Sequence, residues 1–468
     1  MRTWVPRVAA AHSWSWSTKV SCLAVASATL FVALWLYMDI PLFLLPAFFG
    51  GVAIIIFTLR NPVYGVLAVV AAQYLPWAVG GITIFQLLGV LVSVLCLVSY
   101  SLIRKGVVLD SIAVPIVLFV LHTLYSLSFT HDPVLTLYFV RKQIFNALFC
   151  ILLVNVIDSF RKLKWLLWAM AGMALLNSFV AGVEYATGRT VESRARGLQE
   201  NENQLGEIAA LGLMVALFAF LSGDRRWKRM LALAVCGILS IGVITSISRG
   251  AVFSVLMGLG FVALRESRHR LRFIIFAVLV GLALPWLPRA FYNRFENVST
   301  QLRGTIVLSQ RSELTTRGYF NKAGMRIWRS HPVLGVGLGN FGFYFIQPGI
   351  NPGKRGSSSK TPPHNLYVQA LAETGTVGFV VLGGWIFLAF LNYVKAERRM
   401  GKERADRSYL RACESLTLVA LILYFSSGNV VYTNFALVMT LSSLCRRCVE
   451  KEESATVPEE SIPLLEPA

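Results

Sequence analysis

Long apolar runs joined by short polar connections dominate this chain of 468 residues. The runs are continuous and lack the alternation of short strands, which disfavours an outer-membrane barrel. Most are close to the roughly 20 residues that an α-helix needs to cross a bilayer. The pattern predicts an all-α polytopic membrane protein with about 14 transmembrane helices, or about 12 if short runs do not cross. The runs lie at about 20–38, 41–59, 62–79, 82–103, 112–129, 143–157, 163–184, 205–222, 229–247, 250–264, 271–287, 366–392, 411–428 and 430–445.

Composition agrees with this interpretation, because 56% hydrophobic and 15% charged residues exclude a soluble globular protein. The first run is too long for a signal-peptide core and has no small-residue cleavage site, so it is expected to be a retained helix. All seven cysteines fall in helices or at the predicted inner side, which leaves none for an external disulfide. The single pair Cys445-Arg-Arg-Cys448 lacks a second pair of zinc ligands and is interpreted as two boundary thiols.

The distribution of positive charge predicts the orientation. If the N-terminus is cytoplasmic, 27 of the 44 Lys and Arg residues fall in cytoplasmic connections and tails, as the positive-inside rule requires. Both termini are then cytoplasmic. The acidic, proline-containing tail 447–468 is expected to be disordered.

One long connection breaks the charge rule. The segment 288–365 is predicted to be external, yet it carries 11 Lys or Arg and only two acids, Glu296 and Glu313. Loops of this length are uncommon unless they are functional or disordered. Its stretch 319–328 has helical character, so we expect an ordered periplasmic loop with short helices. It divides the chain into transmembrane helices at 1–287, the loop at 288–365, further transmembrane helices at 366–446 and the tail.

A histidine stands where the loop returns to the membrane. The segment Thr361-Pro362-Pro363-His364 resembles a helix start, with the threonine as N-cap, a proline at the first helical position and His364 in the first turn. The helix dipole disfavours the imidazolium there, so His364 is expected to stay neutral and able to accept a proton near pH 7. The alternative is a histidine that only packs or hydrogen-bonds at an interface.

External arginines are the other candidates for chemistry. Arg249 lies in a very short connection, Ser248-Arg249-Gly250, where its charge needs water, a lipid phosphate or a bound anion. Arg196 lies in a loop with acids, and Arg317 lies in the long loop. Snorkelling, solvation and headgroup contact are the respective alternatives. Several guanidinium groups converging from separate loops would suit a pyrophosphate, whose oxygens accept paired hydrogen bonds.

Other patterns in the sequence indicate neither a dinucleotide site nor a metal site. Gly337-Leu338-Gly339-Asn340-Phe341-Gly342 fits G-x-G-x-x-G but neither follows a predicted strand nor opens a helix in a βαβ unit. The remaining histidines have no metal-ligand spacing, and no external Asp/Glu cluster indicates a divalent cation. We therefore expect metal-independent chemistry with no cofactor and no nucleic-acid partner.

Three motifs together resemble the O-antigen ligase and polymerase superfamily of bacterial membrane proteins. They are Arg196-Gly197-x5-Asn203, Ser248-Arg249-Gly250, and the run from Arg317 through Arg326 and His331-Pro332-x-x-Gly335-x-Gly337 to His364-Asn365-x9-Gly375-x-x-Gly378. Members resembling this chain move a glycan from undecaprenyl pyrophosphate to an acceptor hydroxyl at the periplasmic face. The resemblance implies that His364 activates the acceptor and that Arg249 and Arg317 hold the pyrophosphate. Further candidate substrate-binding residues are Arg196, Arg326, Asn203, Asn365 and Arg141.

The sequence therefore predicts a metal-independent, inverting glycosyltransferase of the O-antigen ligase type. Its expected partners are an undecaprenyl pyrophosphate-linked glycan donor, a glycolipid acceptor, most simply the lipid A core, and the lipid bilayer. A polymerase that joins repeat units on the same carrier is the alternative, because it needs the same donor group and the same basic site. A lipid-linked sugar transporter is disfavoured, because the helix interiors are nearly free of charge.

Overall fold

Helices account for nearly all of the described chain. The structure is a computed structural model that describes residues 45–75, 78–79, 82–103, 107–190, 193–265, 270–283, 292, 316–347, 363–400, 406–426 and 433–456. Within these ranges a helix lies on each predicted apolar run except the first, which falls outside them. The prediction of an all-α polytopic membrane protein is confirmed. Five described helices are long and apolar enough by themselves to cross a membrane, so the count of 12 to 14 crossings remains a prediction.

The five long apolar helices are α6 (Pro133–Val156), α7 (Phe160–Ala186), α8 (Glu202–Ser222), α9 (Arg226–Thr245) and α15 (Leu366–Arg399). The others are α2 (Leu45–Arg60), α3 (Pro62–Gln73), α4 (Ile84–Ile103), α5 (Ala113–Tyr125), α10 (Arg249–Arg265), α11 (Arg270–Ala283), α13 (Thr316–Ser330), α14 (Phe341–Phe345), α16 (Arg407–Leu423) and α17 (Thr433–Thr456). A 3-10 turn, η2 (Ser126–Ser128), follows α5. Strands β1 (Ala78–Val79) and β2 (Ile82–Thr83) form a short antiparallel hairpin between α3 and α4.

Side-chain caps define where several helices begin. Asn61 accepts a hydrogen bond from the N–H of Val63, and a proline follows it at the first helical position of α3. Asp132 caps α6 in the same way, again before a proline. Asn201 caps α8 through the N–H of Gln204. An asparagine or aspartate followed by proline satisfies a free amide and presets φ for the helix, so the chain turns sharply between apolar runs.

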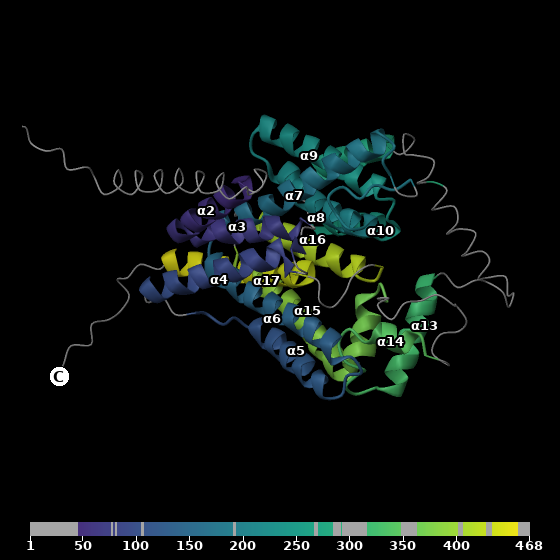
Figure 1. The fold of residues 1–468 in the computed structure, drawn as a ribbon. Helices are drawn as coiled ribbons and strands as arrows, with labels where there is room; N and C mark the ends of the chain where they lie inside the picture. Colours follow the sequence, from purple (N-terminus) through teal and green to yellow (C-terminus); the bar gives the residue numbers. More distant parts are fainter. Residues whose placement is uncertain are drawn as a thin grey trace, which may run out of the picture.

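Helix α8 lies at the centre of the bundle. It packs against α7, α9, α10 and α16, and 89% of its apolar window is buried. Outer helices instead expose large apolar side chains such as Phe253, Leu264 and Leu271, as expected of surfaces that face lipid rather than water. Figure 1 shows α7 to α10 stacked on one side and α13 and α14 projecting beyond α15.

Ion pairs gather at one end of the bundle, which we call the charged end. They join the connections after α4, α6, α10 and α15 to the C-terminal half of α17 and to the start of α16. Arg265 and Arg407 both bind Glu397, at 2.5 and 2.8 Å. The other cross-helix pairs are Lys164–Asp406 at 2.7 Å, Lys451–Asp158 at 3.0 Å, Arg399–Glu450 at 3.0 Å and Arg446–Asp110.

The basic connections that were predicted to share one side of the membrane therefore do meet at the charged end, while the side itself stays a prediction. The opposite end, which we call the loop end, carries the α7–α8 connection, the α9–α10 turn and the start of α15. It is the end on which α13 and α14 are labelled in Figure 1.

The predicted disordered tail begins too early. Helix α17 continues to Thr456, and Glu450 and Lys451 form ion pairs with Arg399 and Asp158. Residues 447–456 are therefore helical, because their charges meet opposite charges from other helices, which composition alone does not reveal. The rest of the tail, 457–468, lies outside the described residues.

Candidate functional site

The turn 332–337 of the long loop is docked onto α15 through backbone hydrogen bonds. Gly375 interrupts α15 with φ +64°, and this break exposes amides and carbonyls that would otherwise bond within the helix. The turn 332–337 pairs with them. The bonds run from the N–H of Val336 to Ala372 O (3.1 Å), Gly337 to Glu373 O (2.9 Å), Thr376 to Pro332 O (2.8 Å) and Val377 to Val333 O (3.1 Å).

This docking explains the glycine motifs. Gly335, Gly337 and Gly339 all have positive φ, and a Cβ on Gly335 would lie 2.5 Å from the carbonyl carbon and oxygen of Glu373. The literal G-x-G-x-x-G is thus a tight turn that approaches another backbone closely. The His-Pro-x-x-Gly-x-Gly motif and Gly375 form the two sides of one contact.

Two buried polar side chains that the sequence analysis missed hold the start of α14. One carboxylate oxygen of Glu373 accepts from the N–H of Phe341 at 3.1 Å, and the other accepts from Gln369 Nε2 at 2.9 Å. Asn340 is fully buried, and its Nδ2 donates to the hydroxyls of Thr130, just before α6, and of Thr136, in the first turn of α6. The loop is therefore tied to two parts of the bundle. In the sequence, the feature that could have pointed to Glu373 is a single carboxylate two residues before Gly375 in an apolar helix.

His364 lies just before α15, whereas the sequence analysis placed it in the first turn of a helix. Helix α15 begins at Leu366, and its N-cap is Asn365, whose Oδ1 accepts from the N–H groups of Tyr367 (3.1 Å) and Val368 (3.2 Å). The prediction of Thr361 as N-cap is wrong, because the asparagine four residues later satisfies the free amides. His364 precedes the cap with φ +54°, and its side chain is exposed. Asn365, a predicted substrate-binding residue, is buried and serves as the cap.

The end of α16 brings two predicted site segments together. The N–H of Leu366 donates to Tyr424 O at 2.9 Å, which places the His364 segment beside this end. Gly250 lies so close to Ser426 that a Cβ there would meet its hydroxyl. Arg249 is the first residue of α10 rather than part of the turn before it. The Ser-Arg-Gly and His-Asn motifs, more than a hundred residues apart in sequence, therefore share one neighbour.

Helix α13 carries Arg317 to the same region. Its Phe320 ring centroid lies 6.0 Å from that of His364, and Trp328 donates from Nε1 to Thr376 Oγ1 at 3.1 Å. Arg317 stands in the first turn of α13, one turn before Phe320, so its backbone lies near His364. The Arg317 side chain lies outside the described residues. Arg326, further along α13, is exposed.

Arg196 and Asn203 already have protein partners. Arg196 donates from Nε to Glu202 Oε1 at 2.9 Å, and Glu202 also pairs with Arg194 at 3.2 Å. Asn203 Oδ1 accepts from Arg194 Nη2 at 3.0 Å. Arg194, which the sequence analysis did not select, is buried and also donates to Ser246 O at 2.8 Å. This motif pins the α7–α8 connection onto the turn before Arg249.

Arg141 is exposed, whereas its neighbour Lys142 lines a cavity. Arg141 is exposed, with its guanidinium carbon 5.5 Å from the centroid of the Tyr138 ring. Lys142 lies 4.4 Å from the same centroid and also lines a cavity in the bundle. The cation nearer the interior is therefore Lys142, because the helix turns it inward by one position.

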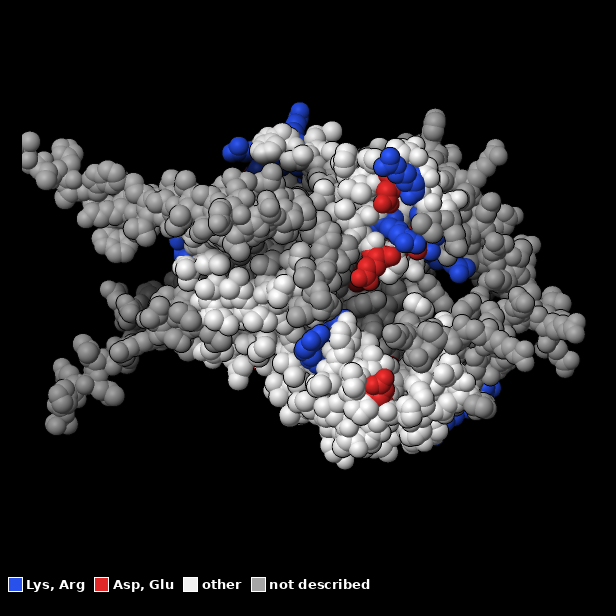
Figure 2. Space-filling model, in the orientation of Figure 1, with Lys and Arg blue, Asp and Glu red and all other residues white. Residues whose placement is uncertain are grey.

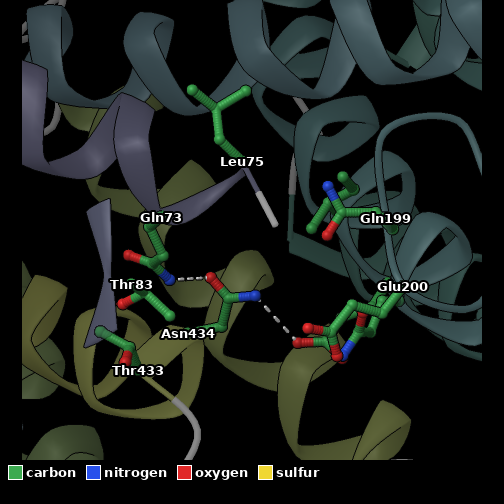
Figure 3. A pocket seen from close by; sticks show the side chains of 10 residues that line it. Gln73, Leu75, Thr83, Gln199, Glu200, Thr433 and Asn434 are labelled. Carbon is green, nitrogen blue, oxygen red and sulfur yellow. Dashed lines mark hydrogen bonds between the residues drawn. The ribbon is translucent and has the colours of Figure 1, made fainter. Parts of the chain in front are cut away.

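A polar cavity opens at the loop end, next to α8. Figure 3 shows Gln73 and Thr83 on one side, Gln199 and Glu200 on the other, and Asn434 between them. The cavity measures about 170 Å³ and adjoins a second chamber of the same size, which reaches Lys142. Figure 2 shows blue and red side chains gathered around a hollow to the right of the centre of this face. Glu207 lines the cavity and is buried inside α8, so the expectation of helix interiors nearly free of charge does not hold at this end.

Comparisons with known proteins bear on the segments that form this site. Residues 234–383 match the O-antigen ligase family, and this range contains Arg249, Arg317, His364 and both sides of the loop docking. This part of the chain is therefore similar to the O-antigen ligase family. It is also similar to the exopolysaccharide production protein ExoQ of Rhizobium meliloti (strain 1021), with 24% identity over 319 residues. That alignment covers 62% of this chain and 70% of the relative.

The match of residues 234–383 to the O-antigen ligase family and the several apolar helices together indicate a multi-pass membrane protein, and the matched family suggests an enzyme of the glycosyltransferase type. Among the described residues, no three His, Cys, Asp or Glu side chains are grouped to hold a metal ion. Several residues around the cavity, including Gln73, Lys142 and Gln199, lie outside the range that matches the ligase family. Gln199 lies within the Arg196-Gly197-x5-Asn203 motif, but no sequence motif pointed to Gln73 or Lys142, because they come from separate helices.

Proposed function

We propose that this protein transfers a glycan from undecaprenyl pyrophosphate to an acceptor hydroxyl at the periplasmic face of the inner membrane. The observation that supports this most is the convergence of three motif segments. The His364 segment, the first turn of α10 with Arg249 and the first turn of α13 with Arg317 all come to the region around the end of α16. An exposed histidine near the helix starts that carry two arginines suits a reaction in which a proton is removed and an anion departs.

In the proposed reaction His364 is the general base and the arginines bind the leaving group. The acceptor oxygen attacks the anomeric carbon, its proton passes to a ring nitrogen of His364, and the bond from that carbon to the pyrophosphate oxygen breaks. Undecaprenyl pyrophosphate leaves with the electron pair, and the configuration at the anomeric carbon inverts. Arg249 and Arg317 stabilise the growing negative charge through paired hydrogen bonds, so the step needs no metal ion. Arg326 is a further cation on the same helix as Arg317.

Two acceptors fit this chemistry. A hydroxyl of the lipid A core is our first candidate, supported by the match of residues 234–383 to the O-antigen ligase family. A repeat unit still on its carrier, which would make the protein a polymerase, is the second. The relative ExoQ supports it, since its name assigns it to exopolysaccharide production. A lipid-linked sugar transporter is the remaining alternative.

The central test is transfer by the purified protein, reconstituted in liposomes with lipid-linked glycan and a candidate acceptor. His364→Ala is expected to lower the rate by a factor of about 100 or more, the usual contribution of a positioned base, without lowering the thermal unfolding temperature. His131→Ala is the matched control. It removes another exposed histidine of the loop end, one that stacks on Phe343, and it should keep the rate. Near-normal transfer by His364→Ala would remove this residue from the mechanism.

A different result in liposomes would favour the transporter alternative. Movement of lipid-linked sugar across the liposome membrane that is unchanged in His364→Ala would contradict both enzymatic proposals. The glycolipid profile of a deletion strain separates the two acceptors. Loss of a ligase leaves finished polymer on the carrier and a bare core, whereas loss of a polymerase leaves one repeat unit on the core.

A further inference from the structure

The two adjoining chambers at the loop end are polar, and the proposed chemistry does not use them. The first chamber lies between the end of α3, the β1–β2 hairpin and the starts of α8 and α17, and the second extends to α4 and α6. They share Gln73, Leu75, Thr83 and Thr433. Each measures about 170 Å³, so together they reach the lower end of the range of about 300–1,000 Å³ that is common for small-molecule sites.

A chain of hydrogen bonds orders the amides that line the first chamber. Gln73 Nε2 donates to Asn434 Oδ1, and Asn434 Nδ2 donates to Glu207 Oε1 at 3.3 Å. The Tyr424 hydroxyl donates to the same carboxylate oxygen at 2.9 Å. The Oε1 atom of Gln73 is buried and accepts no hydrogen bond from the described part of the chain. A buried acceptor that lines a cavity and lacks a protein partner calls for a donor from a bound molecule, since leaving it unpaired is costly.

The charges of the lining residues decide which kind of molecule fits. Among the described residues of the first chamber there are two carboxylates, Glu200 and Glu207, and no Lys or Arg. A pyrophosphate would be repelled there. The other polar groups are amides and hydroxyls, which can each donate as well as accept. They are Gln73, Gln199, Gln204, Asn434, Thr83 and Thr433.

The second chamber adds an apolar wall. Phe85 and Phe145 line it with their rings 5.1 Å apart, edge to face. A sugar ring carries hydroxyl groups around its rim and C–H groups on its faces. Amides and carboxylates for the rim together with aromatic rings for a face therefore match a saccharide better than a lipid chain or an anion.

We propose that these chambers form a subsite for an uncharged sugar, and that this sugar belongs to the acceptor. A connection through Tyr424 to the His364 segment supports the second part. The hydroxyl of Tyr424 donates to Glu207, which lines the first chamber, and its carbonyl accepts from the N–H of Leu366, two residues after His364. This inference rests on the proposed function for the role of the sugar, while the binding of a saccharide can be measured without it.

Two variants perturb the subsite by different physical means. Gln204→Met keeps the length of the side chain and removes its amide, and the cap of α8 is untouched because Asn201 binds the backbone N–H of this residue. Leu75→Trp fills space that both chambers share and removes no polar group. Gln347→Met is the matched control, because this glutamine follows α14 and lines neither chamber. Thermal unfolding of each purified variant shows whether it is folded.

The first measurement is equilibrium binding to the full-length protein in nanodiscs. The probe is the mixture of oligosaccharides that mild acid releases from the surface polysaccharide of the source strain, and undecaprenyl pyrophosphate serves as a sugar-free reference. Gln204→Met should weaken oligosaccharide binding roughly tenfold or more, the effect of one lost buried hydrogen bond, and Leu75→Trp should weaken it by at least as much because its ring occupies the space of the sugar. Both should leave undecaprenyl pyrophosphate binding unchanged. The control should bind both probes like the unaltered protein.

The second measurement is the dependence of transfer on each substrate. Both variants should raise the KM for the acceptor and leave the KM for the donor unchanged. A rise confined to the donor KM would overturn the assignment to the acceptor. Unchanged oligosaccharide binding in both folded variants would mean that the chambers hold only water and would overturn the subsite altogether. If oligosaccharide binding is lost in these variants while the unaltered protein transfers no glycan to any acceptor tested, the subsite is upheld and the proposed function is refuted.

Discussion

Gly375→Ala should release the external loop from the bundle. Gly375 has φ +64°, a region that alanine rarely adopts, and its added Cβ would lie 2.5 Å from Gly335 N and from the carbonyl carbon of Val333. These are backbone atoms, which cannot rotate away as a side chain can. The turn 332–337 must therefore move away from α15, or the backbone of α15 must change its conformation at residue 375.

The cost can be worked from the contacts. The left-handed backbone conformation costs a non-glycine residue about 1–2 kcal/mol. The displacement of the turn also endangers the four backbone hydrogen bonds between 332–337 and 372–377, each with a net contribution of about 1 kcal/mol. The sum, about 5 kcal/mol, equals the lower end of the net stability of a whole domain. Undocking of the loop is therefore expected rather than a small adjustment.

Limited proteolysis of the purified protein measures this directly. Gly375→Ala should speed cleavage within 316–347 and abolish transfer, because α13 and the turn no longer hold their positions around His364. Gly383→Ala is the control in the same helix. A Cβ there meets nothing within 4 Å, so this variant should cleave and transfer like the unaltered protein. A Gly375→Ala protein with unchanged cleavage and transfer would refute the argument that this backbone contact holds the loop.

Three further perturbations have distinct expected outcomes. Arg194→Ala should lower the unfolding free energy by about 3 kcal/mol, because it leaves Glu202 without its buried partner. Arg196→Ala should lower it by under about 1 kcal/mol. Thermal unfolding that ranks the two variants in reverse would be evidence against the roles assigned to these pairs. Their side chains are 9% and 42% exposed, respectively. Glu373→Gln should cost about 1–3 kcal/mol in the same assay, since the new amide turns a donor toward the Phe341 N–H or the Gln369 amide, and an unchanged unfolding temperature would contradict this. Arg249→Lys should lower kcat/KM for the donor about tenfold or more, because lysine cannot form paired hydrogen bonds with a pyrophosphate; full activity would remove Arg249 from donor binding.

Most of the helical architecture could be predicted from the sequence alone. A helix that crosses a membrane satisfies its own backbone and must be apolar over about 20 residues, so its position is written locally in the chain. The positive-inside rule is also a property of local charge, and the ion pairs at the charged end show that the basic connections it groups do meet. The motif segments around Arg249 and His364 were likewise recognisable in sequence.

The tertiary structure decided what those segments do. Asn365 rather than Thr361 caps α15, because competition between nearby caps depends on where the chain enters the helix. Glu373 and Gly375 act through contacts with residues about forty positions earlier, and Arg194 acts through a turn some fifty positions later. Each such contact joins parts of the chain that have no periodic relation, so no local pattern encodes it.

The cavity is the clearest case of this limit. Its lining comes from separate helices, and single glutamines and asparagines such as Gln73 and Asn434 look like ordinary boundary residues in sequence. Only packing brings their amides around one space and leaves a buried oxygen without a protein partner. The sequence by itself determined the helices, the charge distribution and the motif segments, because those are local. The convergence of the motifs and the polar chambers beside them came from the folded structure, because distance in space is not recorded in sequence spacing.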